Sequence, residues 1–362
     1  MSSAESVDPF RIGVLDEGLT PDPESFEQVF VRPVRLRFEE AVESGEIDRP
    51  VEIVVARGHG LPSGTARSIE DAWCELRDAG VLMIIGPGIA DNCIAVKPLF
   101  ERHGVATLNF PGTTKSRGEY GFHYQLGALY EDGPLAARAI AAAGMHEVAV
   151  IRDRSPVGQE FFEYFAEQCE TSDLSITVDR LCSPVATDLS DDVARAKAAK
   201  PDALVYLGFG GVLAQLSRDL RAASWDPPRF TTTAGLHWYS SPPQARELLS
   251  GWVYTDMVDE DNPVLARLEA TYQERFGETA FNPTVGAFYD MATLATLALR
   301  HAPVHTIEGV KAGLERIHHV PSALGGAGTV MGFGPWERTA LKGPDYLLLR
   351  RMGVDTTQRY RP

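Results

Sequence analysis

Residues 81–114, VLMIIGPGIADNCIAVKPLFERHGVATLNFPGTT, decide the expected fold because they show one strand-and-helix unit twice, with a polar loop after each strand. Residues 81–85 form a continuous apolar run that is rich in β-branched side chains and ends at Gly86-Pro87-Gly88. This pattern is typical of a strand that is buried on both faces and stopped by a tight turn. A helix is expected to follow it.

That helix is expected to begin near Asp91 and Asn92, whose side chains supply cap chemistry, and to close at Gly104. A second short strand at 105–108 then runs into another polar loop at 109–114. Parallel sheets bring such loops side by side at their carboxyl edge, where the ligands of open α/β folds bind. The two loops therefore predict a binding site.

This segment resembles the first lobe of the type I periplasmic binding proteins, the leucine/isoleucine/valine-binding family of ABC-transporter receptors. The shared pattern is an apolar strand, IGP, a small polar loop, a helix ending in ERxG, a short strand and PGTT. The likeness continues through 122–151, which resembles a crossover strand, the first helix of lobe two and the next strand, and through 152–159, RDRSPVGQ. Gly334-Pro335-Trp336 resembles the third crossover, so the likeness covers most of the chain.

Strand and helix patterns alternate along the chain, which is the signature of doubly wound α/β folds with parallel sheets. The resemblance implies two such lobes joined by three hinge crossovers, with lobe 1 at 10–123 plus 253–331 and lobe 2 at 124–252 plus 332–362. The residues alone indicate a single boundary near Gly121. Strands are expected near 12–15, 51–56, 81–85, 105–108, 148–151, 175–179, 203–207 and 230–233, and late helices at 263–276, 283–302 and 307–318.

Composition limits the classes of partner. The chain has 362 residues, 44% of them hydrophobic, so it is long enough for two cores. Its net charge of -16 argues against nucleic acid and anionic membrane surfaces as partners. No apolar run reaches the ~18 residues of a membrane span, so no membrane insertion is expected. The four cysteines show no CxxC spacing and are interpreted as buried or idle thiols.

The first residues show neither the basic nor the apolar region of a signal peptide. As the sequence stands, this favours a cytoplasmic location; a periplasmic or extracellular one is expected if a signal peptide has been removed.

Lobe 1 offers candidate ligand contacts in the loops after three of its strands. Glu17 follows the first strand and can accept a bond from a ligand amine or hydroxyl, although nearby acids also suit an ordinary helix start. Asp91 and Asn92 suit a cap, and the N–H groups beside them suit an anion. The resemblance implies that Thr113 and Thr114 offer hydroxyls to the ligand. The candidates here are Glu17, Gly88, Asp91, Asn92, Asn109, Phe110, Thr113 and Thr114.

Lobe 2 is expected to contribute Ser155, Phe209, Ala234 and His237. Receptors of this family use an acid close to Ala234 to pair the ligand ammonium, and its absence argues against an α-amino acid held in the usual way. His237 and the aromatic residues after it suit either an aromatic ligand or simple packing. The resemblance implies that two tyrosines also face the cleft, Tyr130 at the first crossover and Tyr289 on a lobe 1 helix.

Enzyme, metal and cofactor motifs are absent from the sequence, which has no G-x-S-x-G, Walker A or HExxH. We therefore expect no catalytic residues and no cofactor. The leading hypothesis is a protein that closes on a small organic solute, an amino acid, amide or carboxylate, in its interlobe cleft. Its expected partner is an ABC permease.

Three other hypotheses stay open. A cytoplasmic sensor with a regulatory protein as partner is one, because IADNCIAVKPLFER and Gly133-Pro134-Leu135-Ala136-Ala137 resemble the amide-sensing regulator of bacterial amidase operons. The others are a ligand-independent interaction protein and, less favoured, an enzyme that acts on the bound solute.

Overall fold

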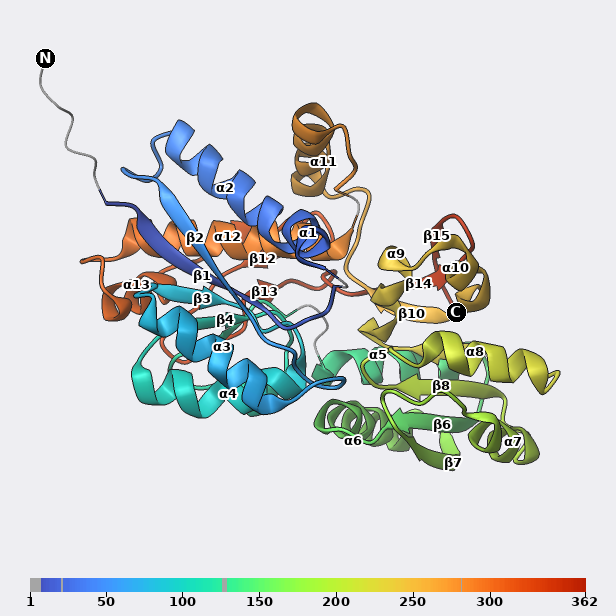
Figure 1. Cartoon of the computed structure of the whole chain (residues 1–362). Coiled ribbons are helices and arrows are strands. Elements are labelled where there is room, and N and C mark those ends of the chain that lie inside the picture. The colour runs from blue at the N-terminus through green and yellow to red at the C-terminus, as the bar shows by residue number, and fades with distance from the viewer. Residues whose placement is uncertain (1–7, 21, 126–128, 281) are drawn as a thin grey trace, which may run out of the picture. The chain divides into compact units, whose positions relative to one another are not determined.

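The computed structural model describes residues 8–20, 22–125, 129–280 and 282–362, which divide into two compact units (Figure 1). Unit 1 comprises Met1–Gln125 and Asp259–Tyr346, and unit 2 comprises Leu126–Val258 and Leu347–Pro362. The chain therefore passes three times from one unit to the other. The doubly wound α/β architecture expected from the sequence is confirmed in both units.

The second crossing lies after Val258, six residues beyond the sequence-based boundary at 252. The reason is strand pairing. The strand β10 (Val253–Asp256) pairs with β9 (Arg229–Thr231) on one side and with β14 (Leu348–Met352) on the other, which makes it part of the unit 2 sheet. Residues 253–258 thus belong to unit 2 and not to lobe 1.

The third crossing lies after Tyr346, whereas the sequence places it at 331. Residues 332–346 stay in unit 1 because β13 (Leu341–Lys342) pairs with β12 (Val330–Met331). Gly334-Pro335-Trp336 consequently lies between these two strands rather than at a crossover.

Unit 1 contains a five-stranded parallel sheet with the order β2-β1-β3-β4-β5. Ile12 and Val14 on the first strand have no exposed surface, and they pair with Met83 and Ile85 of the strand at the centre of the sheet. A sheet buried on both faces explains the continuous apolar runs in the sequence. The strands are β1 (Phe10–Asp16), β2 (Val51–Arg57), β3 (Met83–Ile85), β4 (Thr107–Asn109) and β5 (Gly121–His123).

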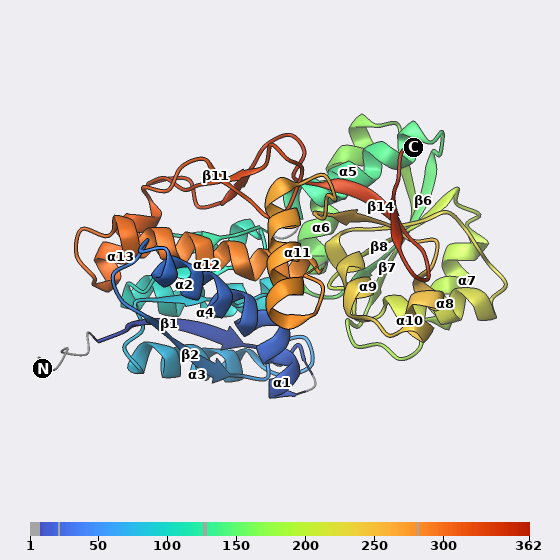
Figure 2. The ribbon, with the colours of Figure 1, turned by 90° about the horizontal axis from the view of Figure 1, so that it is seen from above.

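Helices cover both faces of this sheet (Figure 1). On one face α3 (Ala66–Asp78) and α4 (Ala90–His103) bury Trp73 and Phe100 against the strands. On the other face α12 (Pro283–His301) lies beside both α2 (Arg32–Glu43) and α13 (Ile307–Leu314), as Figure 2 shows from above. Unit 1 also contains α1 (Pro23–Phe26), the π-helical turn η1 (Glu27–Val31), the 3-10 turn η2 (Thr114–Ser116), α11 (Pro263–Phe276) and β11 (Val320–Pro321).

Unit 2 contains a seven-stranded sheet with the order β15-β14-β10-β9-β8-β6-β7. Its strands run in one direction except β14, which pairs antiparallel with β10 and with β15; the chain adds β14 and β15 after the third crossing. The further strands are β6 (Glu147–Asp153), β7 (Ser175–Cys182), β8 (Ala203–Leu207) and β15 (Thr357–Arg359). The helices are α5 (Leu129–Ala142), α6 (Pro156–Thr171), α7 (Ser190–Ala198), α8 (Leu213–Ala222), the 3-10 turn η3 (Thr233–Leu236), α9 (His237–Ser240) and α10 (Pro243–Leu249).

None of the helices in the described part of the chain is both long enough and apolar enough to cross a bilayer.

Candidate functional site

The crossings start from the same edge of each sheet at which the parallel strands end. The first crossing, after Gln125, follows the carboxyl end of β5, and the second, after Val258, follows that of β10. The first residue of β14, Leu348, pairs with Asp256 at the end of β10, so the chain re-enters unit 2 at this edge too. The loops at the carboxyl edges, where α/β folds bind ligands, are therefore the ones next to the crossings.

In unit 1 the carboxyl edge is organised around Glu17, the residue after β1. Its carboxylate accepts hydrogen bonds from the backbone N–H of Gly88, from the N–H of Ile89 at 3.0 Å and from the side-chain amide of Asn92 at 2.7 Å. Only 5% of Glu17 is exposed, and burial raises its pKa to about 7 because desolvation outweighs these donors. The side chain thus joins the loop after β1 to the loop after β3.

The cap of α4 differs from the one that the sequence predicts. Asp91 and Asn92 lie in the first turn of the helix, and the N-cap is Ile89, whose side chain makes no capping hydrogen bond. The capping carboxylate instead comes from Glu17, 72 residues earlier in the chain. Asn92 is fully buried and also accepts from the N–H of Leu61 at 2.9 Å, so its amide ties a third loop to the same place.

The end of β4 and the loop after it hold four of the predicted residues, which lie in different environments. Asn109 is fully buried, and its side-chain amide has no hydrogen-bond partner within the described residues. Buried amides are nearly always bonded, so Asn109 holds unused bonding capacity. The ring of Phe110 lies 5.5 Å from that of Phe288. Thr113 is buried and its hydroxyl accepts from the N–H of Lys115 at 3.3 Å, whereas Thr114 is exposed.

Tyr289, on α12, uses its hydroxyl within unit 1. It donates a hydrogen bond of 2.6 Å to Glu40 on α2, which ties the two helices together. This places the phenol oxygen in a helix-to-helix contact.

In unit 2 the carboxyl edge is organised around Asp153, the last residue of β6, which sequence reasoning missed. It has no exposed surface, and it accepts from the hydroxyl of Tyr206 at 2.7 Å and from the N–H of Phe209 at 2.8 Å. Burial raises its pKa. The His237 ring lies 4.8 Å from that of Phe209, and its Nε2 is 3.1 Å from the Phe209 carbonyl oxygen. Ser155 caps α6 by accepting from the N–H of Gly158 at 3.1 Å.

A second buried acid, Asp132 of α5, corrects the inference that no acid lies near Ala234. Its Oδ2 accepts from the hydroxyl of Thr233 at 2.7 Å and from the Thr233 N–H at 3.3 Å, directly before Ala234 in the chain. The Oδ1 atom is buried and has no hydrogen-bond partner in the described ranges. Burial raises the pKa of Asp132 to about 7. Tyr130, two residues earlier, places its ring 6.3 Å from that of Tyr164.

In the sequence, Asp132 is visible only as part of an acidic pair with Glu131 in the first turn of a predicted helix. Such a pair is interpreted as ordinary negative charge at a helix start. Asp153 gives an equally plain signal as a polar residue at a strand end. Only the fold shows which loops these carboxylates reach.

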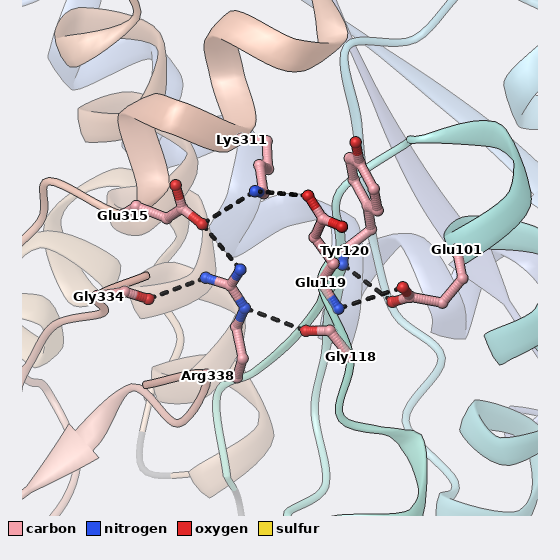
Figure 3. Close-up of polar contacts among 8 residues, drawn as sticks. All are labelled: Glu101, Gly118, Glu119, Tyr120, Lys311, Glu315, Gly334 and Arg338. Carbon is pink, nitrogen blue, oxygen red and sulfur yellow. Dashed lines mark hydrogen bonds and ion pairs between the residues drawn. The ribbon is translucent and has the colours of Figure 1, made fainter. Parts of the chain in front are cut away.

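A separate pocket of about 440 Å³ lies in unit 1 at the amino end of β5, the opposite edge of the sheet. Its cations are engaged by neighbours (Figure 3): Lys311 lies between Glu119 at 3.2 Å and Glu315 at 3.1 Å. Arg338 donates to Glu315 at 2.8 Å and to the carbonyl oxygens of Gly118 and Gly334. This network holds the turn between β12 and β13 in place, and we assign no ligand to it.

Within the ranges that the structure describes, no group of three or more His, Cys, Asp or Glu side chains is arranged to hold a metal ion. The carboxylates of the two carboxyl edges are each bonded to backbone N–H, hydroxyl or amide donors. Such bonds hold the loops of each edge in place.

Comparison with known proteins agrees with this architecture. A family model described as periplasmic binding protein matches residues 9–338. No curated protein sequence matches the chain. Among solved structures, a periplasmic binding protein type 1 from Bordetella pertussis Tohama I has a TM-score of 0.80 at 20% identity, covering 98% of this chain and 100% of that one.

Two further solved structures are similar over nearly the whole chain. A leucine-binding protein from Thermotoga maritima has a TM-score of 0.79 at 16% identity, covering 97% of each chain. A fatty acid ABC transporter substrate-binding protein from Thermomonospora curvata has a TM-score of 0.80 at 17% identity, covering 98% of this chain and 92% of that one. The family model and the shared architecture lead to one conclusion: this chain belongs to the periplasmic binding protein family and has its type I fold.

Proposed function

We propose that this protein binds a small organic solute between its two units and closes on it by hinge movement at the three crossings. One observation carries the proposal: in each unit the polar loops at the carboxyl ends of the parallel strands adjoin the crossings. A solute that touches both sets of loops would favour a closed state, because only there does it make all its contacts.

The predicted residues divide by whether their polar atoms are already used. Glu17, Asn92, Ser155, His237 and Tyr289 bond to their own unit and hold loops or helices in place. Asn109 and Asp132 each keep a buried polar atom without a partner among the described residues, so they have hydrogen-bonding capacity for a solute. We propose these two as the polar contacts of the site, with Gly88, Asp91, Phe110, Thr113, Thr114, Tyr130, Phe209 and Ala234 as its further candidate lining.

The proposed solute class is an amino acid, an amide or a carboxylate. The names of two similar structures mention leucine and fatty acids, but at 16% and 17% identity each name applies to that protein alone. Asp132 brings solutes with an amino group back into the proposed class, because a buried carboxylate next to Ala234 can pair with the ammonium of such a solute. As delivery partner we propose an ABC permease.

A thermal-shift screen over amino acids, amides and aliphatic and aromatic acids tests solute binding. A true ligand at 100 times its dissociation constant should add ~2.7 kcal/mol to the free energy of unfolding. Small-angle scattering with the hit should then show a smaller radius of gyration. If no compound of these classes stabilises the protein, the proposal is contradicted. If NMR shows that the protein converts the stabilising compound into a product, the protein is an enzyme.

Reconstitution distinguishes a transport receptor from a sensor. Solute-loaded protein should stimulate ATP hydrolysis by the proposed partner ABC permease, in proteoliposomes, at least several-fold over the unloaded form. If the loaded protein does not stimulate ATP hydrolysis but captures a regulatory protein only when solute is bound, the sensor is favoured. Cell fractionation decides on which side of the membrane the protein works.

A further inference from the structure

The start of α4 in unit 1 already holds a carboxylate group. Helix N-termini expose N–H groups that have no partner within the helix, and the helix dipole favours negative charge there. In this chain the N–H groups of Gly88 and Ile89 already bond to the Glu17 carboxylate, and the N-cap side chain contributes nothing. The place is occupied by a side chain of the protein.

Several contacts hold the Glu17 carboxylate in its position at the start of α4. Glu17 is buried, and Asn92 donates to its second oxygen at 2.7 Å. A Cβ on Gly88 would lie 2.7 Å from the Glu17 Oε1, so any side chain at this position would push the carboxylate out of its present place. A Cβ on Gly60 would lie 2.5 Å from the Asn92 amide nitrogen, which leaves no space behind the donor either.

We propose that Glu17 determines specificity by filling the carboxylate position at the start of α4, so that a solute reaches this edge with a group other than a carboxylate. The inference rests on the proposed solute binding and narrows it. A free carboxylate group would have to displace Glu17 from three donors and leave a buried acid without them. A solute group that donates a hydrogen bond meets no such competition, because it does not need these donors.

Glu17→Ala tests the occupation directly, because the substitution removes the atoms of one acetate molecule and leaves the Cβ in place. We expect acetate and formate to stabilise this variant saturably in thermal unfolding, by several degrees more than chloride at equal ionic strength. The wild type and Glu17→Gln, which refills the space with a neutral amide, should show no difference between the salts. Equal effects of acetate and chloride on folded Glu17→Ala would overturn the proposal.

A second variant protects the test against misfolding. Glu17→Ser keeps a polar residue after β1 and also removes the carboxylate from the start of α4. If both open variants fold only when acetate or formate is present during refolding, the proposal is supported; if they fail to fold in every salt, it is wrong. These outcomes need no solute, so they are independent of whether the protein binds one.

The effect on solutes provides the second readout. Carboxylate-bearing compounds that the wild type ignores should bind Glu17→Ala at least 10-fold more tightly than they bind Glu17→Gln. Equal affinity of all three proteins for such compounds contradicts a role in specificity, even where the acetate result shows an open place.

Discussion

The hydroxyl of Tyr124 donates a hydrogen bond of 2.7 Å to the carboxylate of Asp290, which joins the residue after β5 to the middle of α12. The same carboxylate accepts from the hydroxyl of Ser322 at 2.6 Å and from the N–H of Ala323. All of these groups are buried in unit 1. The network therefore fixes the end of the sheet at the point from which the chain leaves the unit.

Removing one partner of this network should cost stability. We expect Tyr124→Phe to lower the free energy of unfolding by about 1–2 kcal/mol and Asp290→Asn to lower it by more, because Asp290 serves several donors. Urea unfolding measures both. Tyr120→Phe is the matched control, since its ring lies beside Lys311 outside this network. Equal stability of Tyr124→Phe and wild type would show that the bond contributes nothing.

Stability should fall as pH rises towards and through neutrality. Burial raises the pKa of Glu17 and Asp132 to about 7 and that of Asp290 to about 6. Between these values and the lower pKa values of the unfolded chain, the folded protein holds protons that the unfolded chain has lost. The stabilisation is complete below the unfolded-state pKa values and is lost as pH rises through the folded ones.

Urea midpoints measured from pH 4 to 8 should show this slope, on the order of 1 kcal/mol per pKa unit and group. Glu17→Gln should flatten it, because the amide does not titrate. A stability that rises steadily over this range would contradict the buried carboxyls as its main cause.

Asp132 should decide how strongly an amino-bearing solute binds. If its Oδ1 pairs a ligand ammonium, Asp132→Asn should weaken binding roughly 10- to 100-fold, as expected for a lost charged hydrogen bond. Calorimetry with the hit from the screen provides the measurement. Glu131→Gln, which changes the adjacent carboxyl, is the control, and a loss of similar size in that variant would place the contact elsewhere.

Substitutions of Arg338 and Trp336 should differ sharply in their effect on stability, although both residues line the unit 1 pocket of about 440 Å³. Arg338 is buried and donates to three acceptors, so Arg338→Ala should lower the free energy of unfolding by about 2–4 kcal/mol. Trp336 is 97% exposed, so Trp336→Ala should change it by less than about 0.5 kcal/mol. Thermal unfolding separates the two, and a large loss for Trp336→Ala would show a contact that this conformation lacks.

The parallel strands and late helices could be predicted because apolar runs and helical periodicity are local. β1, β6 and β8 contain the strands expected at 12–15, 148–151 and 203–207, β3 covers only the last three residues of the strand expected at 81–85, and α11 begins and ends where the pattern indicates. β10 escaped prediction from the residue pattern, because it has only four residues and because pairing with distant strands, which no local pattern records, makes it part of a sheet. β5, with three residues, was expected only through the resemblance, as a crossover strand.

The candidate site was predictable as a set of loops but not as a set of bonds. Glu17, Gly88 and Asn92 were all expected near the carboxyl edge, and the structure joins them. The groups to which these residues bond were not predictable, because Glu17 accepts from N–H groups at the start of a helix that begins 73 residues later in the chain. Asp132 and Asp153 were missed because an acid at a helix start or strand end has an ordinary interpretation until its partner is known.

The interleaving of the two units has a consequence for synthesis on the ribosome. Unit 1 needs residues as far as Tyr346, and β14 and β15 of unit 2 follow only after that point. Until Leu348 to Met352 emerge, β10 lacks its antiparallel neighbour and exposes a free strand edge. A ribosome-bound chain therefore cannot finish one unit before it begins the other, because unit 1 stays incomplete until Tyr346 has emerged and unit 2 until β14 and β15 have emerged.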